Sequence, residues 1–141
     1  MEESLTVRGV FRSVDEVETS GDIGKPLITV AGTMDALLPI KRGARAYEAR
    51  VLESREHHQD RHHHPAYRLY EIQNGNHIES FSLLFPGQIE VIQPHAQKAF
   101  DFLVDHVEND QELPLSQCIP KGGEISQSPA EPGHCANLFA P

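Results

Sequence analysis

Two residues of this sequence, Asp35 and His77, have the types and positions that acid–base chemistry requires. Asp35 lies just after a short apolar run, residues 27–31, and His77 lies just after a second strand-like run, residues 67–72. Reactive groups in open parallel sheets gather outside the carboxyl ends of the strands. If the two runs are neighbouring strands, the carboxylate can accept the imidazole Nδ1–H and stabilise the imidazolium. The pair then forms an acid–base relay that still needs a nucleophile.

The elements that must position this pair are predicted as strand, helix, strand and helix. Residues 27–31 are β-branched and apolar between turn residues, which is typical of a parallel strand buried on both faces. Pro39, followed by apolar residues at helical spacing, predicts a helix over about residues 39–54. Residues 67–72 favour a second strand. Such a unit almost always pairs its two strands in parallel.

The chain divides into three stretches. Residues 1–23 contain an alternating segment, residues 5–11, that predicts a strand. Residues 24–109 form a partial α/β domain, closed by an amphipathic helix that starts at Pro94 and ends between residues 106 and 109. Residues 110–141 are rich in Pro and Gly and predict an extended or disordered tail. Since a two-stranded parallel sheet leaves both edges unpaired, we expect more sheet beside these elements.

The turns that carry the two residues resemble those of a known family. Residues 32–39, Gly-Thr-Met-Asp-Ala-Leu-Leu-Pro, resemble the G-x-x-D-x-x-x-P turn of the α/β-hydrolase family, which carries its triad acid. Residues 74–77, Asn-Gly-Asn-His, resemble the turn with that family's triad histidine. The resemblance implies the C-terminal strand-helix-strand-helix part of an α/β-hydrolase sheet, with Asp35 and His77 as catalytic residues. It implies an ester substrate and no cofactor or metal.

A narrower resemblance lies in the tail. Residues 113–117, Leu-Pro-Leu-Ser-Gln, and residues 120–123, Pro-Lys-Gly-Gly, are similar to C-terminal tails of 3-hydroxybutyrate oligomer hydrolases and, less closely, tannase-like esterases. This resemblance implies a secreted or periplasmic parent protein that hydrolyses esters such as polyhydroxyalkanoate oligomers. The residues themselves leave localisation open, because the acidic first residues lead into no apolar segment.

The nucleophile of such an enzyme is missing. No serine of the chain stands in the G-x-S-x-G elbow of α/β-hydrolases; the serines are Ser4, Ser13, Ser20, Ser54, Ser80, Ser82, Ser116, Ser126 and Ser128. We therefore expect the C-terminal portion of a serine esterase, inactive alone and completed by a missing N-terminal portion. The alternative is a non-catalytic, hydrolase-like interaction domain that forms a homodimer through its sheet edge.

Each candidate residue also has a plainer interpretation. Asp35 could cap the helix at Pro39, and His77 could face solvent after an Asn-Gly turn. The histidine-rich run at residues 57–64 could bind a transition metal, but we expect a solvated insertion. Several apolar residues after His77 could wall an acyl pocket or pack the last helix; they are Phe81, Leu83, Leu84 and Phe85.

Composition and cysteine count limit the possible partners and the cellular compartment of the protein. The 141 residues carry a formal charge of −9, with scattered Lys and Arg, so the sequence predicts no nucleic-acid partner. No apolar run approaches the length that spans a bilayer, and we expect no membrane contact. Cys118 and Cys135 could form a disulfide in an exported protein or remain thiols in a cytosolic one.

Overall fold

The structure is a computed structural model that describes residues 2–58 and 64–141. In chain order its elements are α1 (Glu2–Val17), β1 (Leu27–Gly32), α2 (Ala44–His57), β2 (Tyr67–Ile72), β3 (Gly75–Asn76), α3 (Phe81–Leu84), β4 (Glu90–Val91), α4 (Gln93–Asn109) and β5 (Gln117–Ile119). Within these residues no helix is both long and apolar enough to cross a membrane.

The two predicted strands form the centre of a parallel sheet. β1 and β2 pair in parallel from Leu27 opposite Tyr67 to Gly32 opposite Ile72, as the strand-helix-strand order predicts. The sheet has the order β1-β2-β5 and all its pairs are parallel. The short strands β3 and β4 form a second parallel pair. The fold class is therefore α/β, as expected.

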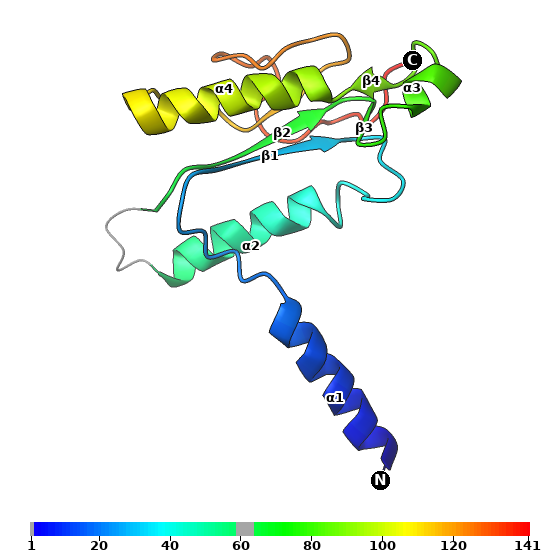
Figure 1. Ribbon diagram of the computed structural model, residues 1–141, viewed down its shortest axis with the longest axis vertical. Helices are drawn as coiled ribbons and strands as arrows, with labels where there is room; N and C mark the ends of the chain where they lie inside the picture. Colours follow the sequence, from blue (N-terminus) through cyan, green and yellow to red (C-terminus); the bar gives the residue numbers. More distant parts are fainter. Residues whose placement is uncertain (1, 59–63) are drawn as a thin grey trace.

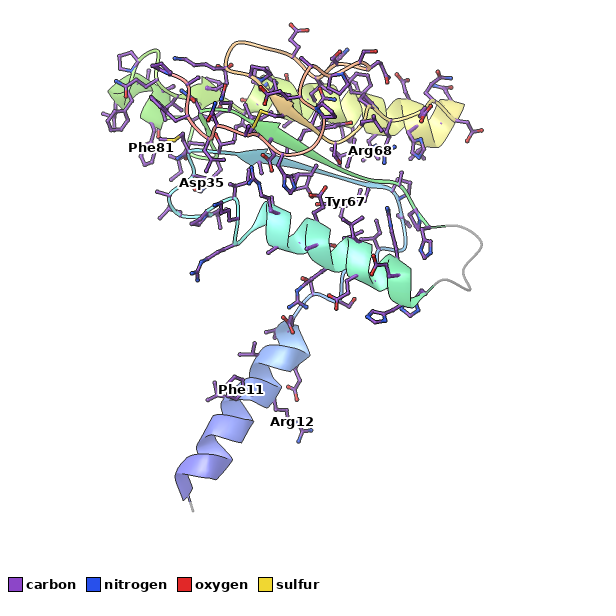
Figure 2. All side chains as sticks on the ribbon, turned by 180° about the vertical axis from the view of Figure 1, so that it is seen from behind. Phe11, Arg12, Asp35, Tyr67, Arg68 and Phe81 are labelled. Carbon is purple, nitrogen blue, oxygen red and sulfur yellow. A yellow bond between two sulfur atoms is a disulfide. The ribbon has the colours of Figure 1, made fainter. Side chains whose placement is uncertain are left out.

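Helices cover both faces of this sheet. α2 lies on one face and α4 on the other (Figure 1). Alternate side chains of β2 pack on the two faces of the sheet, because successive side chains of a strand point to opposite faces. Leu69 packs in the cluster with Val51 of α2, whereas Ile72 packs in the cluster with Ala99 of α4. Figure 2 shows Tyr67 pointing toward α2, where its ring meets Tyr47 edge to face. The sheet is thus covered on both sides, but only β2 is largely buried; Leu27 to Ala31 of β1, predicted to be buried on both faces, are partly exposed.

The prediction of a strand at residues 5–11 is wrong, because these residues belong to α1. The apolar residues of this stretch also fit helical spacing, as Val10, Phe11, Val14 and Val17 show. An ion pair of 3.4 Å between Arg12 and Glu16, one turn apart, fits the helix. α1 projects away from the sheet (Figure 1), so no strand partner holds it extended.

The first sheet helix begins later than predicted. The expected range was 39–54, but α2 spans Ala44–His57. The carbonyl oxygen of Pro39 accepts hydrogen bonds from the N–H groups of Arg42 and Gly43, each at 2.9 Å, and forms a tight turn before the helix. Proline therefore starts a turn here instead of the helix. The closing helix agrees with prediction: α4 spans Gln93–Asn109 and ends at Asp110, whose φ is 52°.

The tail, predicted to be extended or disordered, runs mostly without regular structure and contains one short strand that the sequence analysis did not predict. β5 adds a third strand to the sheet, with Tyr70 opposite Gln117 and Ile72 opposite Ile119. A disulfide joins Cys118 of β5 to Cys135, so the pairing that the sequence left open is present. In the described parts of the chain, β5 covers one edge of β2, while no strand pairs with the outer edge of β1.

Candidate active site

The turns after β1 and β2 are pressed against each other at the carboxyl end of the sheet. A Cβ on Gly32 would lie 2.2 Å from the carbonyl oxygen of Gly75, so only glycine permits this approach. The same carbonyl accepts a hydrogen bond of 3.0 Å from the N–H of Met34. Asp35 and His77 follow these glycines closely in sequence. The backbone therefore brings their side chains to one place.

Asp35 and His77 are in direct contact. Oδ2 of Asp35 is hydrogen-bonded to Nδ1 of His77. The Asp35 side chain is buried, whereas 43% of the His77 side chain is exposed. The two side chains thus meet at the carboxyl end of the sheet, as the sequence predicts. In Figure 2, Asp35 lies at the same end of the molecule as Phe81.

The second carboxylate oxygen of Asp35 is held by backbone. Oδ1 accepts hydrogen bonds from the N–H groups of Leu37 at 3.0 Å and Leu38 at 2.9 Å. Burial alone would raise the pKa of Asp35, but hydrogen bonds from Leu38, His77 and Leu37 together hold that pKa below 3.8. Asp35 therefore caps a turn, not the helix expected at Pro39, and it contacts His77 with its other oxygen.

The ionised carboxylate determines which ring nitrogen of His77 carries the proton. A carboxylate only accepts hydrogen bonds, so Nδ1 must be the donor in this contact. In neutral His77, Nε2 then has a free lone pair and can accept a proton. The turn is fixed by Asn76, whose side chain donates to the carbonyl of Met34 at 3.0 Å and accepts from the N–H of Ile78 at 2.8 Å. The arrangement suits a general base.

Both residues line a cleft of about 340 Å³ beside the outer edge of β1. Its other lining residues are Thr29, Val30, Ala31, Gly32, Leu38, Gly43, Ala44, Tyr47 and Ile92. The walls are mainly apolar, and no serine or cysteine lies among them. The cleft can therefore hold a small, largely apolar group against the histidine, but these walls supply no serine or thiol nucleophile.

The other candidate residues lie elsewhere. Leu83, Leu84 and Phe85 are exposed and are not part of this cleft; Leu83 is 83% exposed. In the histidine-rich run, His57, His58 and His64 are described, whereas His62 and His63 lie outside the described residues. Among described residues, no group of three or more His, Cys, Asp or Glu side chains could hold a metal ion.

Sequence reasoning missed a buried ion pair under the site. Glu71 of β2 is fully buried, and its carboxylate receives two hydrogen bonds of 2.7 Å from the guanidinium of Arg45. The hydrogen bond to Glu71 raises the pKa of Arg45, and the N–H of Cys135 adds a third bond of 2.7 Å to the carboxylate. A charged residue in a strand that helices cover on both faces signals that a partner exists, but it does not identify that partner.

The fold and the site together define an α/β protein with a carboxylate–imidazole pair at the carboxyl end of a parallel sheet. The model of the 3HB-oligomer hydrolase family matches residues 2–139, and the chain belongs to this family. This agrees with the similarity seen in the tail sequence.

Curated relatives support the same family. The D-(-)-3-hydroxybutyrate oligomer hydrolase of Burkholderia thailandensis is 30% identical over 131 residues, which cover 86% of this chain and 18% of that protein. The protein of the same name from Burkholderia cenocepacia is 32% identical over 129 residues, again 86% of this chain and 18% of the relative. The chain thus spans less than a fifth of the length of these relatives. No solved structure matches the chain.

Proposed function

We propose that this chain supplies the acid and the histidine of a serine hydrolase that cleaves ester bonds in 3-hydroxybutyrate oligomers. The observation that carries the proposal is the hydrogen bond between Oδ2 of buried Asp35 and Nδ1 of His77. The triad assignment and the α/β-hydrolase fold are part of this proposal. Family membership supports the substrate class, because the relatives are named as 3-hydroxybutyrate oligomer hydrolases.

The chemistry requires a serine from outside residues 1–141. The serine oxygen would attack the ester carbonyl while Nε2 of His77 takes its proton, and His77 would return that proton to the alcohol oxygen that leaves as the ester bond breaks. Water would then cleave the acyl-enzyme by the same route. Asp35 would hold the Nδ1–H tautomer and stabilise the imidazolium. The chain alone should therefore be inactive.

The outer edge of β1 is where we place the segment that brings this serine. Strand edges present unpaired backbone groups, and in the described chain no strand covers this one. Apolar clefts open on both sides of it: the one at Asp35 and His77 on the α2 side, and one of about 270 Å³ that Val30, Phe100 and Leu103 help to line on the α4 side. The relatives are more than five times longer than the matched region. We therefore propose that the rest of the hydrolase polypeptide packs against this edge.

A chimeric enzyme tests the catalytic roles. In it, this chain replaces the corresponding segment of the Burkholderia thailandensis relative, and kcat/KM is measured with a 3-hydroxybutyrate trimer. His77→Ala and Asp35→Asn should each lower kcat/KM by about 10⁴-fold. His57→Ala, which changes an exposed histidine on α2, is the matched control and should leave kcat/KM unchanged. A fully active His77→Ala chimera would refute the proposed function.

The alternative function is a homodimer through the same β1 edge. The free edge favours this reading too, since any strand of suitable register can extend a sheet. Sedimentation of the isolated chain separates the two: a monomer that associates with the remaining hydrolase polypeptide supports the catalytic reading. A stable dimer that does not bind this polypeptide supports the alternative.

A further inference from the structure

The C-terminal segment, residues 137–140, crosses the turns that carry Asp35 and His77. Figure 1 shows it ending beside β3 and β4, at the carboxyl end of the sheet. The side chain of Gln73 donates to the carbonyl of Asn137 at 2.8 Å, and the hydroxyl of Thr33 donates to the carbonyl of Leu138. The segment thus contacts both turns.

Asn74 is the centre of these contacts. It is fully buried and has a φ of 62°, a conformation that few residues other than glycine adopt. Its amide nitrogen donates to the carbonyls of Gln88 at 2.8 Å and Ala140 at 2.6 Å. Its amide oxygen accepts from the N–H of Ala140 at 2.7 Å. The side chain therefore ties the histidine turn to the C-terminal segment by two opposed hydrogen bonds.

Thr33 joins the two turns to each other. Its hydroxyl oxygen accepts a hydrogen bond of 2.9 Å from the backbone N–H of Asn74 while its proton goes to Leu138. Thr33 lies two residues before Asp35, and Asn74 lies three residues before His77. A displacement of the segment would therefore act on both members of the pair.

We propose that residues 137–140 form a brace that sets the geometry of the Asp35–His77 pair, with Asn74 as the principal positioning residue. The brace is anchored by the disulfide between Cys118 and Cys135, since Cys135 lies two residues before its first residue, Asn137. Its effect on catalysis rests on the proposed function, whereas its effect on the hydrogen bond between Asp35 and His77 does not.

Substitution of Asn74 by glycine isolates the side-chain contacts. Glycine accepts a positive φ without strain, so Asn74→Gly removes the three amide hydrogen bonds and keeps the backbone conformation available. Asp110→Gly is the matched control, because Asp110 also has a positive φ, of 52°, but lies at the distant end of α4. Ala140→Pro changes the partner of Asn74 instead, since proline lacks the backbone N–H that donates a hydrogen bond to the Asn74 side chain.

The measurement is ¹⁵N NMR of the His77 imidazole in the intact chain, at a pH where the ring is neutral, with His77→Gln to assign the signal. The wild type and Asp110→Gly should show the Nδ1–H tautomer. Asn74→Gly and Ala140→Pro should shift the ring toward the Nε2–H tautomer. In the chimeric enzyme Asn74→Gly should lower kcat by about ten- to a hundredfold with little change in KM.

A wild-type tautomer retained in both Asn74→Gly and Ala140→Pro would overturn the brace, even if both variants unfold at lower temperature. Failure of the proposed function looks different: the chimera would stay active after His77→Ala, while the tautomer shift would still show whether the brace orients His77.

Discussion

At the scale of single residues, the two oxygens of the Asp35 carboxylate have separate partners. One holds the turn through the N–H groups of Leu37 and Leu38, and the other faces His77. Because these hydrogen bonds favour the charged form, the pKa of Asp35 lies below its ordinary value despite burial. The charge of this residue is therefore coupled to the stability of the folded chain.

The pH dependence of stability tests this coupling. A carboxylate whose pKa is lowered on folding stabilises the native state above its unfolded pKa, about 3.9, and loses that contribution as pH falls through the folded pKa. The difference in unfolding free energy between wild type and Asp35→Asn should thus shrink as the pH falls below about 4. Urea unfolding at several pH values measures it.

The control for this prediction is Asp101→Asn, which changes an exposed carboxylate on α4. Its free energy of unfolding should differ little from that of wild type at any of these pH values. A difference for Asp35→Asn that did not shrink below about pH 4 would contradict the described hydrogen bonding.

Residues near the site differ in how well the sequence predicts them. Asp35 and His77 lie in turns that resemble those of a known family, so the sequence alone predicts them as site residues. Arg45 and Asn74 were not selected, because their partners Glu71 and Ala140 lie 26 and 66 residues away in sequence. Local pattern carries no information about such pairings.

At the scale of elements, the long periodic segments were predicted well and the short ones were not. α4 has a strong helical pattern over 17 residues and β2 is a six-residue run of strand-favouring residues, and their observed bounds lie close to the expected ones. β5 has only three residues, and its strand character depends on pairing with β2, which is distant in sequence. In α1, strand-like alternation and helical spacing compete over the same residues, and local pattern alone did not separate them.

The disulfide should contribute measurably to stability. Cys118 and Cys135 are 17 residues apart, and closing a loop of this size stabilises the folded state by about 3 kcal/mol. The double variant Cys118→Ser and Cys135→Ser should therefore have an unfolding free energy lower by about this amount in denaturant titrations.

Reductant provides the matched control for the disulfide prediction. It should lower the stability of the wild type to that of the double variant and leave the double variant itself unchanged. Equal stabilities of the oxidised wild type and the double variant would mean that the cross-link adds nothing to the folded chain.

At the scale of the whole molecule, the sheet is asymmetric. β5 and the disulfide-linked segment close one side, while the outer edge of β1 lies between two apolar clefts. The sequence indicated that more sheet belongs beside these elements. It did not indicate which edge is open, because the strand that closes the other edge lies in the segment that the sequence predicts to be extended or disordered.

Phe100 tests whether this open side binds the rest of the hydrolase polypeptide. It is 64% exposed on α4 and lines the cleft beside β1, so Phe100→Glu should weaken association at least tenfold without lowering the melting temperature. Leu83→Glu, on α3, is the control and should bind as wild type does. Calorimetric titration measures both; equal affinities for the two variants would place the interface elsewhere.

The brace has a consequence for the order of events during synthesis. A ribosome makes every chain from its N-terminal end, so β1, β2 and both turns emerge before residues 137–140. If the brace sets the geometry of Asp35 and His77, their alignment must wait until residues 137–140 have been made. A nascent hydrolase would then acquire its reactivity only after the sheet beneath the site had formed.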